Sequence, residues 1–445
     1  SKSSELHHAI TMEAALARLV ELERRSRDQD DKILALQYEK GLDLLSEKRE
    51  ALTKERAEEL LANAPKDAVA VRLGSKSFGE ESSQVAAKVL EGLSKVVIAD
   101  MSDIIAGRPE AEALEVLKVM CGVLPASTLK FIDLSENALG EKGIRALESV
   151  LTSFKSLEGI AFMNNGLSEL SVDLLAGFLP TEHLKLLHFH NNMSGSGGAV
   201  AASKIVLKCS KLEDFRMSSS RVRSDGGLPL LKALSTRAPS LVRLNLSDSM
   251  LDEECTEELV GALKNMPKLT DLVLRDTGIE KGMLLEVLED KDVVPRLSIL
   301  DISGLELESE DADVVGKIVS SRMRLRKLWM DDNELESEGV AKFCLAATCR
   351  ASPSKIEHIS VQTNQVSQRG AVALAQFALA HPSVKLIELN DNQISTDAVE
   401  KIESMLAEKG REGVLGSLND NAGSDDEDED FDLEQVGKAD DLDEL

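Results

Sequence analysis

The chain is poor in aromatic residues: only 3% of its 445 residues are Phe, Trp or Tyr, with a single tryptophan, although 42% are hydrophobic. A core of Leu, Val, Ala and Ile is typical of small repeated layers. Five scattered cysteines without a CxxC pair disfavour a disulfide framework and a zinc site and indicate reduced thiols. No apolar run reaches the roughly 18 residues that span a bilayer, and the N-terminus lacks a hydrophobic signal segment. We therefore expect no membrane insertion.

Motifs of enzyme active sites are also missing from the sequence. It contains no GxxxxGK[ST], HExxH or GxSxG motif, and the glycine-rich run at 194–198 has no following lysine and indicates a turn. The pairs His7-His8 and His188/His190 have no evident third ligand, which disfavours a metal site. We expect a chain that is not itself an enzyme and that needs no cofactor.

Charge of one sign dominates. The net charge of −27 argues against nucleic acid as a partner, since phosphates would be repelled, and fits a cationic or electrostatically steered partner. The last segment, 424–445, carries twelve Asp and Glu residues against one lysine. Self-repulsion in such a segment predicts a disordered tail over 411–445, with docking to a basic partner as the alternative.

A period of about 28 residues runs through most of the chain. The template is L-x-x-L-x-L-x-x-N-x-L, as in Leu129-x-x-Ile132-x-Leu134-x-x-Asn137-x-Leu139. Its asparagine position recurs at residues 137, 165, 192, 220, 249, 277, 305, 333, 364 and 392. Two weaker units near Val71 and Ala99 extend the array to about twelve repeats. The L-x-L part predicts a short strand, and the remainder of each unit has room for a helix.

These observations predict an α/β leucine-rich-repeat solenoid, a horseshoe like that of ribonuclease inhibitor. Residues 68–410 form the repeat domain, and 1–67 form a charged helical segment with an N-terminal cap. In residues 1–60 the apolar positions keep no clean heptad, so one or two amphipathic helices are favoured over a coiled coil with a coiled-coil partner. The repeat asparagine is interpreted as structural, because it bonds backbone where the strand turns.

The residue directly before each asparagine position stands at the end of the strand and is expected to face solvent. We call this series the turn row, and it comprises Glu136, Asn164, Asn191, Ser219, Asp248, Asp276, Gly304, Asp332, Thr363 and Asp391. Repeat packing gives no reason for amides in the turn row, so Asn164 and Asn191 are candidate ligand contacts, with solvated loop amides as the alternative. Trp329, at an outward strand position, is either a contact anchor or packed laterally on neighbouring strands.

Three longer segments add a family resemblance. Asp103–Leu114 (DIIAGRPEAEAL), Leu134–Gly143 (LSENALGEKG) and Leu187–Met193 (LHFHNNM) look like segments of the Ran GTPase-activating proteins, and residues 69–410 resemble the plant branch of that family most closely. The acidic tail is also a feature of the family. Plant members carry an N-terminal Trp-Pro-Pro domain that this sequence lacks, and no folded domain of the animal type follows the tail. We therefore expect a cytoplasmic protein, with a perinuclear or nuclear-envelope pool as the alternative.

The resemblance implies a function. It implies a GTPase activator that binds Ran in its GTP form and acts on Ran's own active site in nucleocytoplasmic transport. No arginine finger is implied: Asn164 positions the catalytic glutamine of Ran, which orients the attacking water. Arg108 matches the family's important arginine, with an implied role in binding and orientation. Glu136, Asn191 and His190 are the further partner-binding candidates.

Two other functions compete with this interpretation. A non-catalytic binding scaffold like ribonuclease inhibitor would use repeats of the same length, but that family is rich in cysteine. The repeat portion of an innate-immune sensor would require a nucleotide-binding domain, and no phosphate loop precedes the repeats.

Overall fold

The computed structural model describes residues 41–44, 50–348 and 355–423. The predictions of helices or a coiled coil over 1–40, the His7-His8 pair, Cys349 and the acidic segment 424–445 lie outside these described residues. The chain divides into two compact units, Ser1–Leu212 and Glu213–Leu445. Each unit is described by itself.

The first unit alternates short strands with helices. Its main sheet is parallel, in the order β1, β3, β5, β6, β7, β8, and β2 pairs with β4 in a small second sheet. The strands are β1 Leu42–Asp43, β2 Glu50–Leu52, β3 Ala70–Arg72, β4 Lys76–Phe78, β5 Ile98–Asp100, β6 Phe131–Asp133, β7 Gly159–Ala161 and β8 Leu186–His188. The helices are α2 Lys54–Leu61, α3 Glu80–Glu91, α4 Glu110–Gly122, α5 Gly140–Ser153, α6 Glu169–Phe178 and α7 Gly195–Lys208.

The second unit repeats the same plan, with strands paired in parallel in sequence order. Its strands are β9 Asp214–Arg216, β10 Arg243–Asn245, β11 Asp271–Val273, β12 Ile299–Asp301, β13 Lys327–Trp329, β14 His358–Ser360 and β15 Leu386–Glu388. Its helices are α8 Ser224–Ser235, α9 Glu253–Leu263, α10 Lys281–Glu289, α11 Ala312–Ser321, α12 Glu336–Thr348, α13 Gln368–Ala380 and α14 Thr396–Glu408. This pattern confirms the predicted α/β leucine-rich-repeat solenoid.

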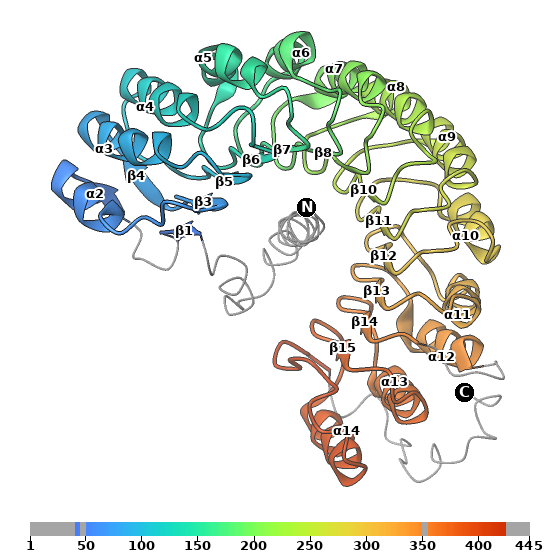
Figure 1. The fold of residues 1–445 in the computed structure, drawn as a ribbon. Coiled ribbons are helices and arrows are strands. Elements are labelled where there is room, and N and C mark those ends of the chain that lie inside the picture. The colour runs from blue at the N-terminus through green and yellow to red at the C-terminus, as the bar shows by residue number, and fades with distance from the viewer. Residues whose placement is uncertain (1–40, 45–49, 349–354, 424–445) are drawn as a thin grey trace. The chain divides into compact units, whose positions relative to one another are not determined.

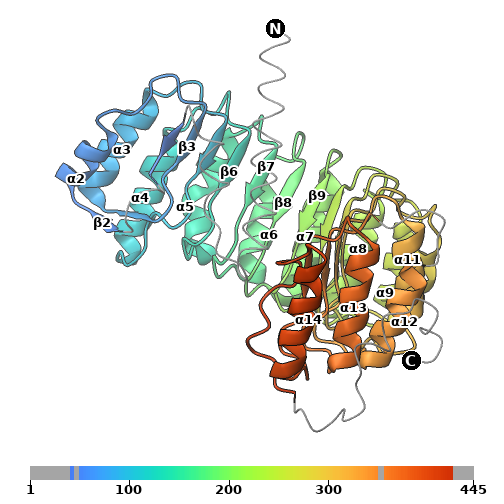
Figure 2. The ribbon, with the colours of Figure 1, turned by 90° about the horizontal axis from the view of Figure 1, so that it is seen from below.

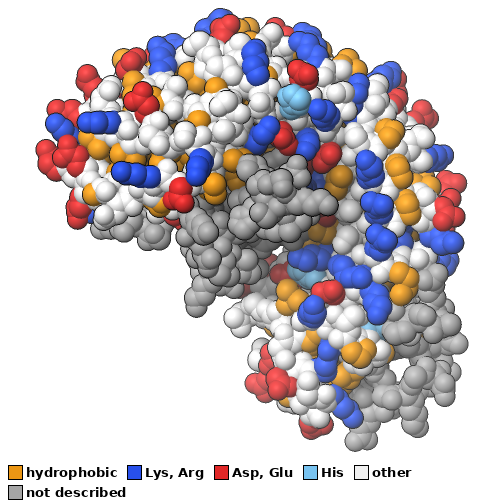
Figure 3. Space-filling view, viewed as in Figure 1, with side chains coloured by type: hydrophobic (Ala, Val, Ile, Leu, Met, Phe, Trp, Pro, Cys, Tyr) orange, Lys and Arg blue, Asp and Glu red, His pale blue; other side chains and the backbone are white. Residues whose placement is uncertain are grey.

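Alternation along each strand explains how the layers form. In β6 the central residue Ile132 is fully buried and points towards the helices, while Phe131 and Asp133 project from the opposite side. Helices of neighbouring repeats pack on one another behind the strands, as Figures 1 and 2 show for each unit. Their outer surfaces carry interspersed acidic and basic side chains (Figure 3). Each repeat therefore buries its leucines only against its neighbours.

The array begins earlier than the sequence pattern indicated. Residues 42–43 and 50–52 are strands rather than helix, so the helical prediction is wrong for this stretch. Leu42 pairs with Val71 of β3, because Leu42-Asp43-Leu44 is itself an L-x-L unit one period before Val71-Arg72-Leu73.

The array also continues past residue 410. Leu415 forms a parallel bridge with Ile387 of β15. The side-chain oxygen of Asn421 accepts a hydrogen bond from the backbone N–H of Asn392 at 2.8 Å. This is the contact that repeat asparagines make, so the predicted tail boundary cuts through a last partial repeat.

The structure tests the expectations for the cysteines, for Trp329 and for membrane-spanning helices. The described cysteines, Cys121, Cys209, Cys255 and Cys344, are free and buried. Trp329 is half-buried, and its ring meets that of His358 on the next strand edge-on at 4.9 Å, which supports lateral packing. Across the described part of the chain, no helix is both long enough and apolar enough to cross a membrane.

Candidate functional site

The repeat asparagines form a buried ladder that shapes the end of every strand where they occur. Asn165 is fully buried, and its Oδ1 accepts hydrogen bonds from the backbone N–H groups of Asn137 and Leu139 in the preceding repeat. Its Nδ2 donates to the carbonyl of Leu134 at 3.0 Å. Because each asparagine joins two repeats through backbone groups, the structural interpretation of this position is confirmed.

The turn row has a backbone conformation of its own. All ten of its residues adopt positive φ, for example +62° at Glu136, +49° at Asn164 and +51° at Asn191. In this left-handed turn the backbone N–H of Asn164 donates to the carbonyl of His190 at 3.0 Å, and that of Glu136 donates to the carbonyl of Met163 at 2.8 Å. The left-handed turn thus bonds each repeat to the next.

This conformation corrects one argument made from the sequence. Asn and Asp populate the left-handed region more readily than most residues, so repeat packing does provide a reason for amides in the turn row. Residue type alone therefore does not separate Asn164 from Asp248 or Asp391. The side-chain contacts must do so.

Those contacts join three turn-row residues of the first unit. Asn164 Nδ2 donates to Glu136 Oε2 at 2.6 Å, and Asn191 Nδ2 donates to Asn164 Oδ1 at 3.2 Å. All three side chains are exposed and follow β6, β7 and β8. An ionised carboxylate only accepts hydrogen bonds, so Glu136 determines which end of the Asn164 amide faces it, and Asn191 meets the other end. We call this hydrogen-bonded set the amide chain.

The amide chain leaves Asn164 with unused hydrogen-bonding capacity. A side-chain amide has two N–H donors and an oxygen with two lone pairs. One donor is engaged by Glu136 and one lone pair by Asn191. A donor and an acceptor therefore remain on one exposed, oriented amide, which is the complement of a second amide.

Arg108 lies apart from the amide chain, in the loop between β5 and α4. Its Nε donates to Ser77 Oγ at 2.9 Å, and a terminal nitrogen donates to the Ser77 carbonyl at 2.8 Å. Another terminal nitrogen lies 3.9 Å from a carboxylate oxygen of Glu112. The Arg108 side chain is 20% exposed, and a Cβ at Gly79 would lie 2.8 Å from its guanidinium. The guanidinium is thus held in a defined place at the loop edge, with part of it reachable from solvent.

The two histidines singled out in the sequence have different surroundings. His188 is the last residue of β8 and is buried. His190 is half-buried beyond the strand, and its carbonyl accepts hydrogen bonds from Asn164 N–H and Asn192 Nδ2. Its backbone therefore supports the Asn164 turn. Within the described ranges, no cluster of three or more His, Cys, Asp and Glu side chains could hold a metal ion.

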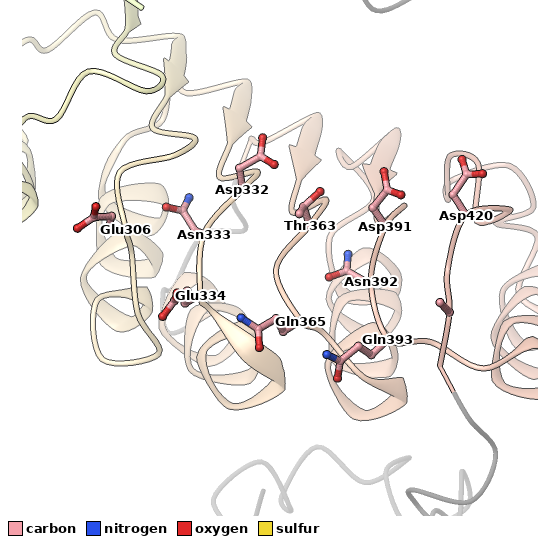
Figure 4. Close-up of a pocket in the computed structure, with 11 residues that line it drawn as sticks. Glu306, Asp332, Asn333, Glu334, Thr363, Gln365, Asp391, Asn392, Gln393 and Asp420 are labelled. Carbon is pink, nitrogen blue, oxygen red and sulfur yellow. The ribbon is translucent and has the colours of Figure 1, made fainter. Parts of the chain in front are cut away.

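The second unit carries the turn row in an acidic form. A groove of about 600 Å³ opens along the loops that follow β12 to β15. Figure 4 shows Asp332, Thr363, Asp391 and Asp420 in one row at these loops, with Glu306, Glu334, Gln365 and Gln393 in a second row. Asp420 precedes the asparagine of the last partial repeat, as turn-row residues do in the other repeats, but without their positive φ. The sequence analysis did not include it, although Leu418-Asn419-Asp420-Asn421 repeats the letters of Leu389-Asn390-Asp391-Asn392.

Comparison with known proteins gives matches to a family model, to a solved structure and to curated proteins. A family model described as Leucine Rich repeat matches residues 126–147. In the crystal structure of the Rad7 and Elc1 complex in yeast, a chain superposes with a TM-score of 0.53 at 14% identity, over 94% of both chains. Ribonuclease inhibitor of Sus scrofa is 24% identical over 328 residues, or 65% of this chain and 71% of that protein. These matches agree with the fold.

Two curated relatives have a higher sequence identity to this chain than ribonuclease inhibitor has. RAN GTPase-activating protein 1 of Arabidopsis thaliana is 34% identical over 160 residues, which are 35% of this chain and 30% of that protein. RAN GTPase-activating protein 2 of Arabidopsis thaliana is 35% identical over 384 residues, which are 85% of this chain and 70% of that protein. The chain therefore belongs to the Ran GTPase-activating protein family.

Proposed function

We propose that this chain stimulates GTP hydrolysis by Ran and that it binds Ran in the GTP-bound form. Family membership supports Ran as the partner, since the two Arabidopsis relatives are named for activating that GTPase. The single observation that carries the mechanism is the amide of Asn164, held between Glu136 and Asn191 with one donor and one acceptor to spare.

The proposed action is to orient the glutamine of Ran that aligns the attacking water. Phosphoryl transfer to water depends on positioning and on charge stabilisation, and a GTPase glutamine that rotates freely aligns the water poorly. The spare N–H and lone pair of Asn164 can form two hydrogen bonds with that glutamine amide. The backbone turn at Asn164 is hydrogen-bonded to His190, and its side chain to Glu136 and Asn191. The Asn164 amide is therefore largely ordered before Ran binds, and binding loses little of its conformational entropy.

Charge favours the first unit as the location of this site. Asn164 and Asn191 are neutral, and the carboxylate beside them, Glu136, accepts a hydrogen bond from Asn164, whereas the second unit places the carboxylates Asp332, Asp391 and Asp420 at the equivalent loops. A carboxylate close to the transferring phosphoryl group would oppose the charge that develops there. An amide can align the glutamine without that repulsion.

Arg108 is proposed to bind and orient Ran rather than to enter its active site. Its Nε and one terminal nitrogen are committed to Ser77, which holds the side chain back against the preceding repeat. The remaining guanidinium N–H groups can pair with a carboxylate or a backbone carbonyl of the partner. An arginine finger would have to abandon the Ser77 contacts, so the geometry favours a fixed docking contact.

The alternative, a non-catalytic scaffold like ribonuclease inhibitor, is less favoured because the match to that protein has 24% identity against 35% for the Ran relative. One experiment separates the two. GTP hydrolysis by an excess of GTP-loaded Ran is followed with this protein at one-hundredth of the Ran concentration. An activator drives hydrolysis to completion through many turnovers. A stoichiometric binder leaves nearly all of the GTP intact, and that result would overturn the proposal.

A further inference from the structure

The loops that follow β11 and β12 are not joined by a repeat asparagine. Leu305 occupies the asparagine position of the β12 repeat, and its side chain cannot accept a hydrogen bond. One repeat later Asn333 shows what is lost, because its Oδ1 accepts from the N–H groups of Leu305 and Leu307 at 3.1 and 2.9 Å. The equivalent donors that face Leu305 are the backbone N–H groups of Thr277 and Ile279.

These two N–H groups have no acceptor. Thr277 and Ile279 are 0% and 3% exposed, and no residue in the described part of the chain accepts a hydrogen bond from the N–H of either. A missing asparagine need not have this result: one repeat earlier, the N–H of Leu251 donates directly to the carbonyl of Thr277 at 2.9 Å. A buried N–H without a partner costs free energy. The loop edge at Leu305 is therefore a weak point of the second unit.

The strands beside this weak point remain joined. β11 and β12 pair in parallel, and the N–H of Asp276, just past β11, still donates to the carbonyl of Ser303 at 3.0 Å. On the side where the chain enters β12, the buried Arg322 donates hydrogen bonds to the backbone carbonyls of Leu288, Asp290, Val293 and Val294. The weakness is thus confined to the loops that follow the strands.

Arg275 crosses these loops in place of the asparagine. Its Nε donates to Asp276 Oδ2 at 2.9 Å, and a terminal nitrogen donates to Asp332 Oδ2 at 2.7 Å, two repeats further along. Gly304 lies between these carboxylates in the turn row, and a Cβ there would lie 1.8 Å from Asp276 Oδ1, so glycine leaves room for the pair. Arg275 thus ties the β11 repeat to the β13 repeat across Leu305.

Lys281, the first residue of α10, makes a second crossing. Its Nζ donates to the carbonyl of Glu306 and lies 3.3 Å from a carboxylate oxygen of Glu308 and 2.8 Å from one of Asp311. The side chains of Arg275 and Lys281 are 22% and 24% exposed. Ion pairs that solvent reaches are weakened by salt, whereas the buried amide bonds of the asparagine ladder are not.

We propose that Arg275 and Lys281 form an ion-pair latch: they hold the loops 277–280 and 304–308 together, and the loops separate locally as salt weakens the pairs, while the rest of the second unit stays folded. The latch adjoins the acidic groove, because Glu306 and Asp332, which its basic side chains contact, both line that groove (Figure 4). Opening of the latch therefore changes the spacing of the acidic side chains in the groove. This inference does not depend on the proposed function.

Hydrogen–deuterium exchange of the full-length chain, measured by mass spectrometry without Ran, tests the latch. Peptides that cover 274–284 should exchange about tenfold faster than peptides that cover 162–172, the equivalent loop, whose N–H groups Asn192 accepts. An increase in ionic strength from about 0.02 M to about 0.5 M should speed exchange several-fold in 274–284 and leave 162–172 unchanged. Equal rates in the two loops, or equal responses to salt, would overturn the proposal.

Two substitutions at Leu305 test the missing acceptor. Leu305→Asn supplies an acceptor for the N–H groups of Thr277 and Ile279 and should slow exchange in 274–284 about tenfold. Leu305→Ala removes the same apolar side chain without supplying an acceptor and should speed exchange. Faster exchange in both variants would show that the acceptor is not what this loop edge lacks.

The ion pairs are tested separately. Arg275→Gln/Lys281→Gln should speed exchange in 274–284 about three- to fivefold and remove most of its salt dependence. The control Lys317→Gln/Lys342→Gln makes the same change in net charge at two exposed helix ion pairs and should leave this exchange unchanged. Circular dichroism checks that all variants keep the parent fold. Equal exchange in the two double variants would refute the latch.

Discussion

Substitution of Asn164 by glycine is the sharpest test of the amide chain. Asn164 has φ of +49°, a conformation that glycine adopts freely but that costs alanine about 1 kcal/mol or more. Asn164→Gly therefore removes the whole side chain while the left-handed turn and its hydrogen bond to His190 persist. The side chain is exposed, so Glu136 and Asn191 regain water in its place. Stability should change by less than about 1 kcal/mol.

The expected loss of activity follows from the two hydrogen bonds that Asn164 can still form. At about 1 to 1.5 kcal/mol each, they sum to about 2–3 kcal/mol. Loss of that stabilisation in the transition state lowers the rate constant of stimulated hydrolysis about 30- to 150-fold. Single-turnover hydrolysis of Ran-bound GTP at saturating concentrations of this protein measures the rate constant without a contribution from affinity.

A matched control is available in the second unit. Asp391 is also a turn-row residue, with φ of +57°, so Asp391→Gly makes the same backbone change away from the amide chain. It should leave stimulated hydrolysis at the parent rate. If Asn164→Gly also stays within about threefold of the parent rate, the glutamine-positioning role of Asn164 is refuted.

Three further predictions follow from single contacts. Arg108→Ala should weaken the affinity for GTP-loaded Ran in a binding titration, whereas Ser77→Ala, which removes one anchoring bond but keeps the guanidinium, should weaken it much less; equal losses would indicate a purely structural arginine. Asn165→Ala removes three hydrogen bonds to buried backbone groups and leaves the N–H groups of Asn137 and Leu139 unsatisfied, while the Leu134 carbonyl keeps its bond from Asn137; at about 1 kcal/mol per bond it should lower the free energy of unfolding by about 3 kcal/mol in urea titrations, and a loss below about 1 kcal/mol would contradict this. Burial raises the pKa of Asp301 to about 6, so the folded chain holds that proton to higher pH than the unfolded chain and stability falls as pH rises from about 4 to about 6. Asp301→Asn should therefore be more stable than the parent at pH 7.5, by at most about 3 kcal/mol, and equal to it near pH 4; an unchanged difference across that range would contradict the shift.

The period of the sequence predicted the architecture because every repeat packs in the same way on its neighbours. Alternation in Phe131-Ile132-Asp133 was enough to place Ile132 in the core. The asparagine position was equally readable, since a buried amide between two repeats has only backbone groups to bond. The sequence did not reveal that Leu42 begins a repeat, because the charged residues around it favour a helix. It did not reveal the repeat asparagine Asn421 either, because the acidic tail begins a few residues later.

The residues of the candidate site could be predicted from the sequence only in part. Family resemblance pointed to Asn164 and Arg108, but amides in the turn row do have a packing reason, contrary to the prediction from the sequence. The left-handed φ of every residue in that row is a property of the folded turn, and it favours Asn and Asp throughout. What distinguishes Asn164 is its pair of side-chain partners, and neither is adjacent in sequence.

The sequence by itself determined the spacing of the repeats, the identity of the buried layers and the position of each turn-row residue, because these depend on interactions that recur within every 28-residue unit. Only the tertiary structure decided that Glu136 and Asn191, 28 and 27 residues away from Asn164, form hydrogen bonds with the two ends of its amide. It likewise decided that Ser77, 31 residues away from Arg108, accepts a hydrogen bond from the guanidinium. Such contacts depend on side-chain rotamers and on the spacing between stacked repeats. The solenoid brings these distant residues within hydrogen-bonding distance, and the chemistry of each pair then orients the groups proposed to meet Ran.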